Sequence, residues 1–360
     1  MQIDGHHTLT YVVARVAGME HNHAEKLAYS AQYVDEATNV KPVIFDNGAM
    51  FERIASAHKM LDYRNSVELS NHLAWIPFHF LPGNDGKKHD EAAHGSFVNR
   101  LICRPDSYVA RDMLRAVAQY RDKAFGLHLM GIAMHVYADT FAHQGFAGIT
   151  HQVNEISDLD SSDDQGLLNR AWEGLKSWAV SSVSPLGHGA ALSFPDRPYV
   201  SWSYENGFGE RVNRDNTEIF LEAANKMYKV IKCYLESDLL MNLDAQPDMP
   251  SKSINQIEQA FRTIKDDKGD ERHKTWLKWL KQGKFGFDPV ELKFIPEGKN
   301  SWKELARGKA KPINGSAGLV QYTFKEEFLE SDWKCFHDAL KTFRIEMVRD
   351  VLPKYGICIA

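Results

Sequence analysis

The sequence predicts an all-α fold, a helical bundle with a mostly helical C-terminal extension. Apolar residues recur at the three- and four-residue spacing of amphipathic helices along most of the chain. No segment before residue 285 shows the alternation of apolar and polar residues that is typical of a strand. Hydrophobic residues make up 43% and charged residues 25% of the 360 residues, as in globular proteins that bury a large core.

This periodicity predicts the individual helices in chain order. Residues 8–17 form a compact apolar segment that Gly18 can end. The segment 124–145 is apolar on most sides, so we expect it at the centre of the core. The same spacing predicts further helices at 23–34, 50–62, 107–122, 164–181, 213–239 and, as one long helix or a pair, 321–352.

Two regions are expected: an all-α domain over residues 1–245, and residues 246–360, a basic linker region with C-terminal helices that pack on that domain. Residues 251–312 hold 15 Lys and Arg against 9 Asp and Glu, whereas the whole chain carries −5. This basic segment is interpreted as a surface for an anionic partner or lipid, or alternatively as the solvated face of an amphipathic helix. The negative total charge argues against a stable complex with nucleic acid.

Several classes of protein are excluded. No apolar run is long enough for a transmembrane helix, and the first residues lack the pattern of a secretory signal. The four cysteines are far apart, which fits a reducing compartment and argues against a thiolate zinc site. We therefore expect a cytoplasmic protein. Neither a nucleophile-elbow motif nor a phosphate-binding P-loop occurs.

Histidine is the informative residue type. Of the 16 histidines, 13 lie in residues 1–151, which are less than half of the chain. His135, Asp139 and His143 are spaced i, i+4, i+8, so one helix face can present all three. Burying two imidazoles and a carboxylate among small and apolar residues is costly unless they are paired or bind a metal ion.

Other candidate ligands surround this motif. His151 and Glu155 form another i, i+4 pair, and Asp35 lies near the end of the second expected helix. His58 and His79 lie between Asp35 and this motif in the chain. A set of nitrogen and oxygen donors without thiolates suits zinc at a catalytic site, and manganese or iron less well.

The order of these residues resembles the superfamily of zinc-dependent phospholipases C and single-strand-specific nucleases, which are all-α proteins with three metal ions. The resemblance covers about residues 1–155 and includes the helix start Gly5-His6-His7-Thr8, Asp35, and His79 before an aromatic residue. It continues with His135 and Asp139 and with the later histidines. Residues 1–210 also look like an uncharacterised bacterial branch of that superfamily with similar PFHFLPG and GHG motifs.

The resemblance implies the assignment of the metal ligands. One metal position would use Asp35, His79, His135 and Asp139, with His58 as the alternative to His79. A second would use His143, His151 and Glu155. A third would use His6 and a bridging Asp139.

The third position would be completed by an N-terminal amine. Family members bind this ion with the terminal amine five residues before the helix-start histidine, and Met1 stands five residues before His6. Gln2 is bulky, so we expect Met1 to be retained with a free amine. Asp4 is the competing candidate.

The activity implied is hydrolysis of a phosphoester, either a small molecule or a phospholipid head group, with two or three zinc ions and a metal-bound hydroxide. Asp35 is the expected catalytic residue that orients or deprotonates the water. The alternative from another class is a helical binding or effector module with a structural metal site, and a metal-dependent oxygenase is a third possibility. The order alone leaves these functions open.

A long segment at 184–210 is rich in Gly, Pro and aromatic residues. Loops of this length in compact domains are usually functional or disordered, and the five aromatic residues favour order. Within it, His188 and Asp196 are predicted to line the substrate pocket. A simple turn capped by Asp196 is the alternative.

Overall fold

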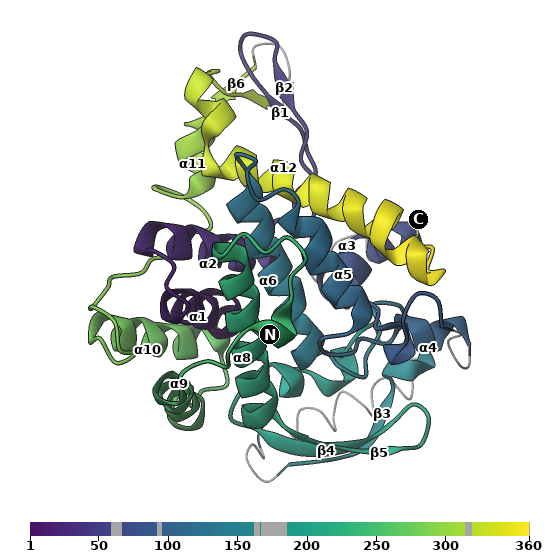
Figure 1. Cartoon of the computed structure of the whole chain (residues 1–360). Helices are drawn as coiled ribbons and strands as arrows, with labels where there is room; N and C mark the ends of the chain where they lie inside the picture. Colours follow the sequence, from purple (N-terminus) through teal and green to yellow (C-terminus); the bar gives the residue numbers. More distant parts are fainter. Residues whose placement is uncertain (59–66, 92–95, 162–165, 167–185, 314–318, 360) are drawn as a thin grey trace.

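The computed structural model describes all residues except 59–66, 92–95, 162–165, 167–185, 314–318 and 360 (Figure 1). The described chain is 54% helical and contains seven short strands in three antiparallel sheets. The fold is therefore mixed α/β, and the all-α prediction is wrong. The strands are two to six residues long, so most of them offer too few alternating positions for a period of two to be recognised.

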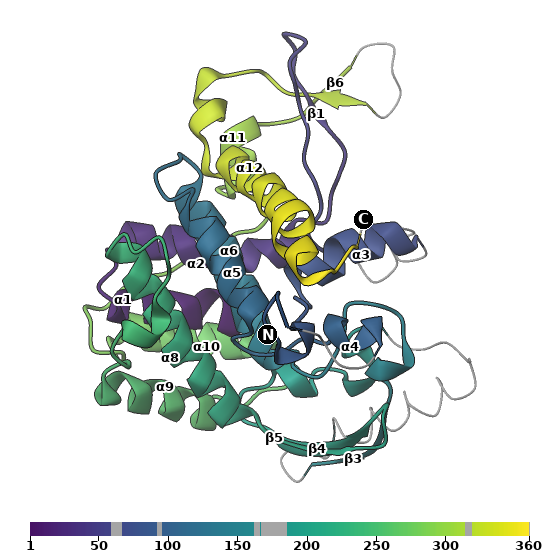
Figure 2. The ribbon, with the colours of Figure 1, turned by 45° about the vertical axis from the view of Figure 1, so that its right-hand side comes forward.

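Helix α6 (Gly126–Ala142) is the centre of the molecule, as its apolar sequence predicts. It is buried along almost its whole length, and it lies among α2 (His21–Glu36), α5 (Tyr108–Ala118), α8 (Asn216–Leu235) and α12 (Asp332–Ile345). Both ribbon views show the long C-terminal helix α12 crossing this group (Figures 1 and 2). A helix covered on all sides holds its polar side chains in fixed positions.

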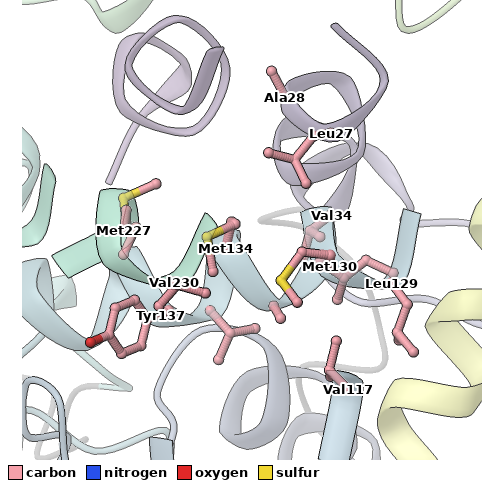
Figure 3. Packing of buried hydrophobic residues seen from close by; sticks show 14 of the residues in the cluster. Leu27, Ala28, Val34, Val117, Leu129, Met130, Met134, Tyr137, Met227 and Val230 are labelled. Carbon is pink, nitrogen blue, oxygen red and sulfur yellow. The ribbon is translucent and has the colours of Figure 1, made fainter. Parts of the chain in front are cut away.

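Side chains from three other helices pack against those of α6, as the close view shows (Figure 3). The α6 side chains in this view are Leu129, Met130, Met134 and Tyr137. Their neighbours come from α2, α5 and α8 and include Leu27, Ala28, Val34, Val117, Met227 and Val230. Burial of this apolar surface fixes the position of α6 within the fold.

The N-terminal segment enters the interior. A π-helical turn, η1 (Asp4–Leu9), continues into α1 (Thr10–Val16), so the helix expected at 8–17 begins four residues earlier. Met1 is 6% exposed, and both ribbon views place the N-terminus among the helices (Figures 1 and 2). The α-amine of Met1 is therefore held inside the protein.

The helix expected at 50–62 is wrong for its described residues. Strand β1 (Val43–Ile44) pairs with β2 (Met50–Phe51), and residues 52–58 are not helical. Phe51 packs against Phe328 and Trp333, with ring centroids 5.3 and 5.9 Å away. These partners from the far end of the chain, which local periodicity does not register, determine the conformation here.

The helix expected at 164–181 lies outside the described residues except for Gly166. Nothing in the described structure tests that prediction.

A second sheet lies at the opposite end of the molecule from β1 and β2 (Figures 1 and 2). It contains β3 (Ile156–Asp160), β4 (Ser201–Asn206) and β5 (Arg211–Asp215) in that order. Trp202 and Tyr204 of β4 are buried against a separate apolar cluster. The described part of segment 184–210 is thus ordered, and it ends in a strand that we did not predict.

The remaining elements connect and cover this core. The further helices are α3 (Glu68–Phe78), α4 (Phe97–Leu101), α9 (Ser251–Thr263), α10 (Gly269–Lys281), α11 (Trp302–Arg307) and the π-helical η9 (Glu346–Val351). Short 3-10 turns are η3 (Asn84–Gly86), η4 (Gln152–Asn154), η5 (Gly189–Ala191), η6 (Phe194–Asp196), η7 (Leu243–Ala245), η8 (Glu326–Glu330) and η10 (Leu352–Tyr355). The third sheet pairs β6 (Lys311–Pro312) with β7 (Val320–Gln321).

The C-terminal region shares its apolar core with the N-terminal region. One continuous cluster of buried residues runs from Met1 to Ile359. In the basic segment, Trp276 and Phe285 are buried in this cluster with stacked rings, so these two aromatic side chains face the protein interior. Among the described helices, none combines the length and apolarity needed to cross a bilayer.

Close packing of α6 on α2 requires the absence of a side chain at Gly131. A Cβ there would lie 2.5 Å from the Leu27 carbonyl oxygen and 2.5 Å from the Ser30 Cβ. We expect Gly131→Ala to lower the free energy of unfolding by about 1–3 kcal/mol, since overpacking forces the two backbones apart. Urea denaturation followed by circular dichroism measures this. An unchanged transition midpoint would contradict the close approach.

Candidate metal centre

Helix α6 presents the three polar residues of the i, i+4, i+8 motif on one side, as predicted. His135 and Asp139 are buried within the helix, and His143 follows its last residue and is also buried. The Nε2 atom of His135 lies 3.3 Å from Asp139 Oδ2, and His143 Nδ1 lies 3.6 Å from the same oxygen. The Asp139 carboxylate is therefore at the middle of this cluster.

A first group of donor atoms forms around Asp139 Oδ2. His79 Nδ1 lies 3.2 Å from His135 Nε2 and 3.5 Å from Asp139 Oδ2. Asp35 Oδ1 lies 3.8 Å from His79 Nδ1 and 3.9 Å from His135 Nε2. Zinc bonds of about 2.0–2.1 Å in tetrahedral geometry place neighbouring donors about 3.3 Å apart. The spacing of His79, His135 and Asp139 fits such an ion, with Asp35 slightly farther out.

A second group lies at the end of α6 and combines His143 with two residues of segment 184–210. Asp196 Oδ1 lies 3.4 Å from His143 Nε2, and Asp196 Oδ2 lies 3.7 Å from His188 Nε2. The α-amine of Met1 lies 3.3 Å from both His143 Nε2 and Asp196 Oδ1. These four residues can surround a second ion.

His6 links the two groups on the N-terminal side. Its Nε2 lies 3.1 Å from Asp139 Oδ1, and its ring stacks on His135 with centroids 3.7 Å apart. Donor atoms of His6, Asp35 and His135 also lie within 4.8 Å of one another. This third group shares His135 with the first, so one nitrogen cannot serve both. Among the described residues, the geometry provides two separate positions and part of a third.

Backbone carbonyls fix the direction of four imidazole rings. A carbonyl oxygen only accepts hydrogen bonds, so the ring nitrogen beside it carries the proton, and the other nitrogen of a neutral ring faces the cluster as a lone pair. The pairs are His79 Nε2 with Ser56 at 3.0 Å, His135 Nδ1 with Ala31 at 2.8 Å, His143 Nδ1 with His79 at 2.8 Å and His188 Nδ1 with Leu192 at 2.8 Å. This arrangement is typical of histidines that bind metal ions.

Several buried atoms of the cluster have no hydrogen-bond partner among the described residues. They are both ring nitrogens of His6, Oδ2 of Asp139 and Oδ1 of Asp196. Except for His6 Nδ1, these atoms keep ionic contacts of 3.1–3.6 Å within the cluster, but the contacts lack hydrogen-bond geometry. Donor atoms that converge in this way could hold a cation.

The protonation states point the same way. Burial lowers the pKa of His6 and of His188 to about 4, so both rings are neutral at pH 7. Burial opposes ionisation of Asp139, but His143 and the Met1 amine outweigh it and hold the pKa of this carboxyl well below its usual range. Neutral imidazoles and ionised carboxylates are the forms that bind metal ions.

The amine of Met1, rather than Asp4, reaches the cluster. The amine lies 2.5 Å from Asp139 Oδ1. Burial acts to lower its pKa, but the Asp139 and Asp196 carboxylates outweigh burial and raise the pKa to about 10, so the amine must lose a proton before it can bind a metal ion. Asp4 instead forms a buried ion pair with Arg272, with 2.6 Å between Oδ2 and Nε. The geometry therefore favours the first of the two candidates.

His151 and Glu155 are outside the cluster. The residues between them form the 3-10 turn η4, and β3 begins directly after Glu155, so the two side chains do not share a helix face. His151 lines a different cavity, its Nδ1 accepts a hydrogen bond from the Val153 amide, and Glu155 is exposed. Their predicted place as donors is occupied by His188 and Asp196.

Of the two alternatives for the first metal position, His79 lies among the donor atoms, whereas His58 lines the wall of the site. The Nδ1 atom of His58 lies 3.3 Å from Asn71 Oδ1. His58 belongs to none of the donor groups in the described chain. Its ring faces the cavity described next.

A cavity of about 400 Å³ opens onto both donor groups. Its polar lining includes Asp35, Asp139, His143 and Asp196. The apolar residues Trp75, Phe80 and Leu186 also line it, and of these only Phe80, the aromatic residue after His79, belongs to a motif recognised in the sequence. Substrate-sized space beside the donors is what a reactive centre requires.

Gly187 brings segment 184–210 close to this cavity. It has φ +55°, and a Cβ there would lie 2.3 Å from Phe80 Cζ. The Phe80 ring in turn stacks on His143 with centroids 4.7 Å apart. A glycine between Leu186 and His188 thus allows His188 to approach Asp196 over the Phe80 ring.

The chain belongs to the family of unknown function DUF6765, whose model matches residues 1–351. That match includes the donor residues and nearly all of the C-terminal helices. Comparison with curated proteins and with solved structures gave no match.

A divalent cation is expected to stabilise the folded chain because the donors converge only there. At a zinc concentration 100 times the Kd, binding adds about 2.7 kcal/mol to the free energy of unfolding. Scanning calorimetry before and after zinc addition to chelator-treated protein measures the rise in Tm. Asp139→Asn should abolish most of this rise, whereas His128→Asn, a buried histidine of the same helix that pairs with Asp332, should retain it. An equal rise in both variants would contradict the assignment.

Proposed function

We propose that this protein is a metal-dependent hydrolase of phosphoester bonds, with two or three zinc ions held by the donor groups around Asp139. One observation carries the proposal. Two donor groups lie next to each other, on either side of the Asp139 carboxylate, and both face the same cavity. Paired metal positions of this kind are typical of enzymes that cleave phosphoesters. The resemblance of the residue order, apart from His151 and Glu155, to that of zinc-dependent phospholipases C and nucleases supports the same activity.

The donor set suits zinc. It consists of imidazole nitrogens, carboxylate oxygens and one amine, without a thiolate. Catalytic zinc sites commonly use three protein ligands and leave a position for water or substrate. When bound, such ions lower the pKa of water and stabilise the negative charge that develops on the phosphoryl group.

Asp35 is the residue placed to handle the proton of the attacking water. Its side chain is 33% exposed and lines the cavity, whereas Asp139 is buried. The Gln32 side-chain amide donates a hydrogen bond to Asp35 Oδ2 at 3.2 Å and so orients the carboxylate. A carboxylate directed into the cavity can orient water or accept a proton from it.

The lining of the cavity favours a small phosphodiester or a phospholipid head group over a nucleic-acid strand. Its described lining residues include neither Lys nor Arg. Proteins that hold nucleic-acid backbones usually contact several phosphates with these residues. Trp75, Phe80 and Leu186 instead offer an apolar wall to the substituent of the phosphate.

Metal content tests the assignment of the donors. We expect two or three zinc ions per chain in protein purified without chelators or metal-affinity resin. His135→Ala and His188→Ala should each lower the zinc content by about one ion and reduce hydrolysis of bis(4-nitrophenyl) phosphate at least about 100-fold, because each removes a ligand. His151→Ala is the matched control and should change neither value.

Two results would overturn the proposal. One is wild-type protein that binds no zinc after incubation with excess metal. The other is protein that binds zinc in a single closed position and hydrolyses no phosphoester, which would support a binding module with a structural metal site.

The role of Asp35 is tested by Asp35→Asn, which keeps the shape of the side chain but removes its basicity. We expect kcat to fall about 10²- to 10⁴-fold, the range that general-base catalysis contributes. Zinc content should stay within error of the wild type, because the nearer donors His79, His135 and Asp139 hold the ion without Asp35. Steady-state kinetics with parallel elemental analysis measures both quantities. A variant with wild-type kcat would exclude Asp35 from proton transfer.

A further inference from the structure

Arg272 of α10 connects the C-terminal region to the segment that begins with Met1. Its guanidinium is fully buried and donates to both carboxylate oxygens of Asp4, at 2.6 Å from Nε and 3.0 Å from a terminal nitrogen. The same terminal nitrogen lies 2.8 Å from Gln2 Oε1. The other terminal nitrogen donates to the Asp266 carbonyl at 2.8 Å. One side chain thus holds the residues on either side of Ile3.

The same guanidinium also contacts the segment that carries the second donor group. A terminal nitrogen lies 3.5 Å from the backbone oxygen of Asp196. The Asp196 carboxylate is one of the donors beside His143. Arg272 therefore contacts both Gln2 and Asp4, which precede His6, and the backbone of Asp196, whose carboxylate is a donor.

Neighbouring residues of α10 reinforce this attachment. A Cβ at Gly269 would lie 2.6 Å from Gln2 Oε1, so the first turn of α10 packs directly on the N-terminal segment. His273, which follows Arg272, has its Nε2 2.9 Å from His7 Nδ1. Consecutive residues of α10 thus contact Asp4 and His7, which lie on either side of His6 in the sequence.

We propose that Arg272 is a positioning residue for the metal centre: its contacts set the spacing between the Met1 amine, His6 and Asp196. This inference rests on the proposed binding of metal ions by the cluster. Arg272 itself touches no donor atom of the cluster, and acts through the backbone and side chains that carry the donors.

The role proposed for Arg272 is to fix geometry rather than to add to the free energy of unfolding. A buried ion pair often contributes no more stability than apolar residues of similar volume would, because both charges lose their hydration. What the planar guanidinium does supply is several hydrogen bonds in fixed directions. Lysine, with one flexible ammonium group, cannot hold Asp4 bidentately and contact Gln2 and Asp196 at the same time.

The test compares Arg272→Lys with the wild type and with Arg111→Met. Arg111 also pairs with two aspartates, Asp106 and Asp244, but lies on α5 away from the donors. Zinc affinity is measured by competition with a chromophoric chelator, at a temperature where circular dichroism shows each protein folded. The visible absorption spectrum of the cobalt-loaded proteins reports the coordination geometry independently of activity.

Arg272→Lys should weaken binding of at least one zinc ion about 10- to 100-fold, the usual effect of removing a residue that orients ligands, and should alter the cobalt spectrum. Arg111→Met should change neither measurement, even where it lowers Tm. Wild-type affinity and an unchanged spectrum in Arg272→Lys would overturn the inference. Absence of zinc and cobalt binding by the wild type would instead overturn the proposed function. If Arg272→Met folds, the same two measurements are made on it and the same changes are expected. If it does not fold, the result for Arg272→Lys decides.

Discussion

The buried carboxylate of Asp139 is the group around which the other donors are arranged. Its Oδ1 accepts a hydrogen bond from the Met1 amine and lies beside His6, and its Oδ2 faces His79 and His135. An ionised carboxylate in this apolar setting is tolerated only with positive charge around it. Residues from the start of the chain, the end of α3 and the middle of α6 must therefore converge at one point.

This requirement explains why α6 is covered on all sides. The packing of α2, α5, α8 and α12 prevents α6 from shifting, and the carbonyls of Ala31, Ser56, His79 and Leu192 fix the imidazole rings. Preorganisation of this kind positions ligands before an ion arrives. The packing of the apolar core therefore also fixes the positions of the candidate site residues.

Local sequence patterns predicted the part of the site that lies on a single helix. His135, Asp139 and His143 could be recognised because four-residue spacing has a fixed meaning on a helix. The same spacing misled at His151 and Glu155, where a 3-10 turn and the start of a strand replace the helix. A four-residue spacing therefore shows that two side chains share a face only where the segment is known to be helical.

Contacts between distant segments could not be read from local patterns. Asp196 and His188 were identified as residues of the site, but nothing in their spacing indicated that they face His143. The strand at Met50–Phe51 depends on aromatic residues near position 330. The expectation of no alternation before residue 285 is wrong at β4, where the buried Trp202 and Tyr204 alternate with the more exposed Ser201 and Ser203.

The contact between Asp4 and Arg272 joins residues that are 268 positions apart in the chain, and that between Met1 and Asp139 spans 138 positions. Contacts of such long range form slowly, because a large loop must close before they contribute. During synthesis, α10 (Gly269–Lys281) follows all of the donor residues, the last of which is Asp196. The contacts of Arg272 and His273 with the N-terminal segment therefore form after the donors have been made, so capture of an ion in this geometry would come late in folding rather than at its beginning.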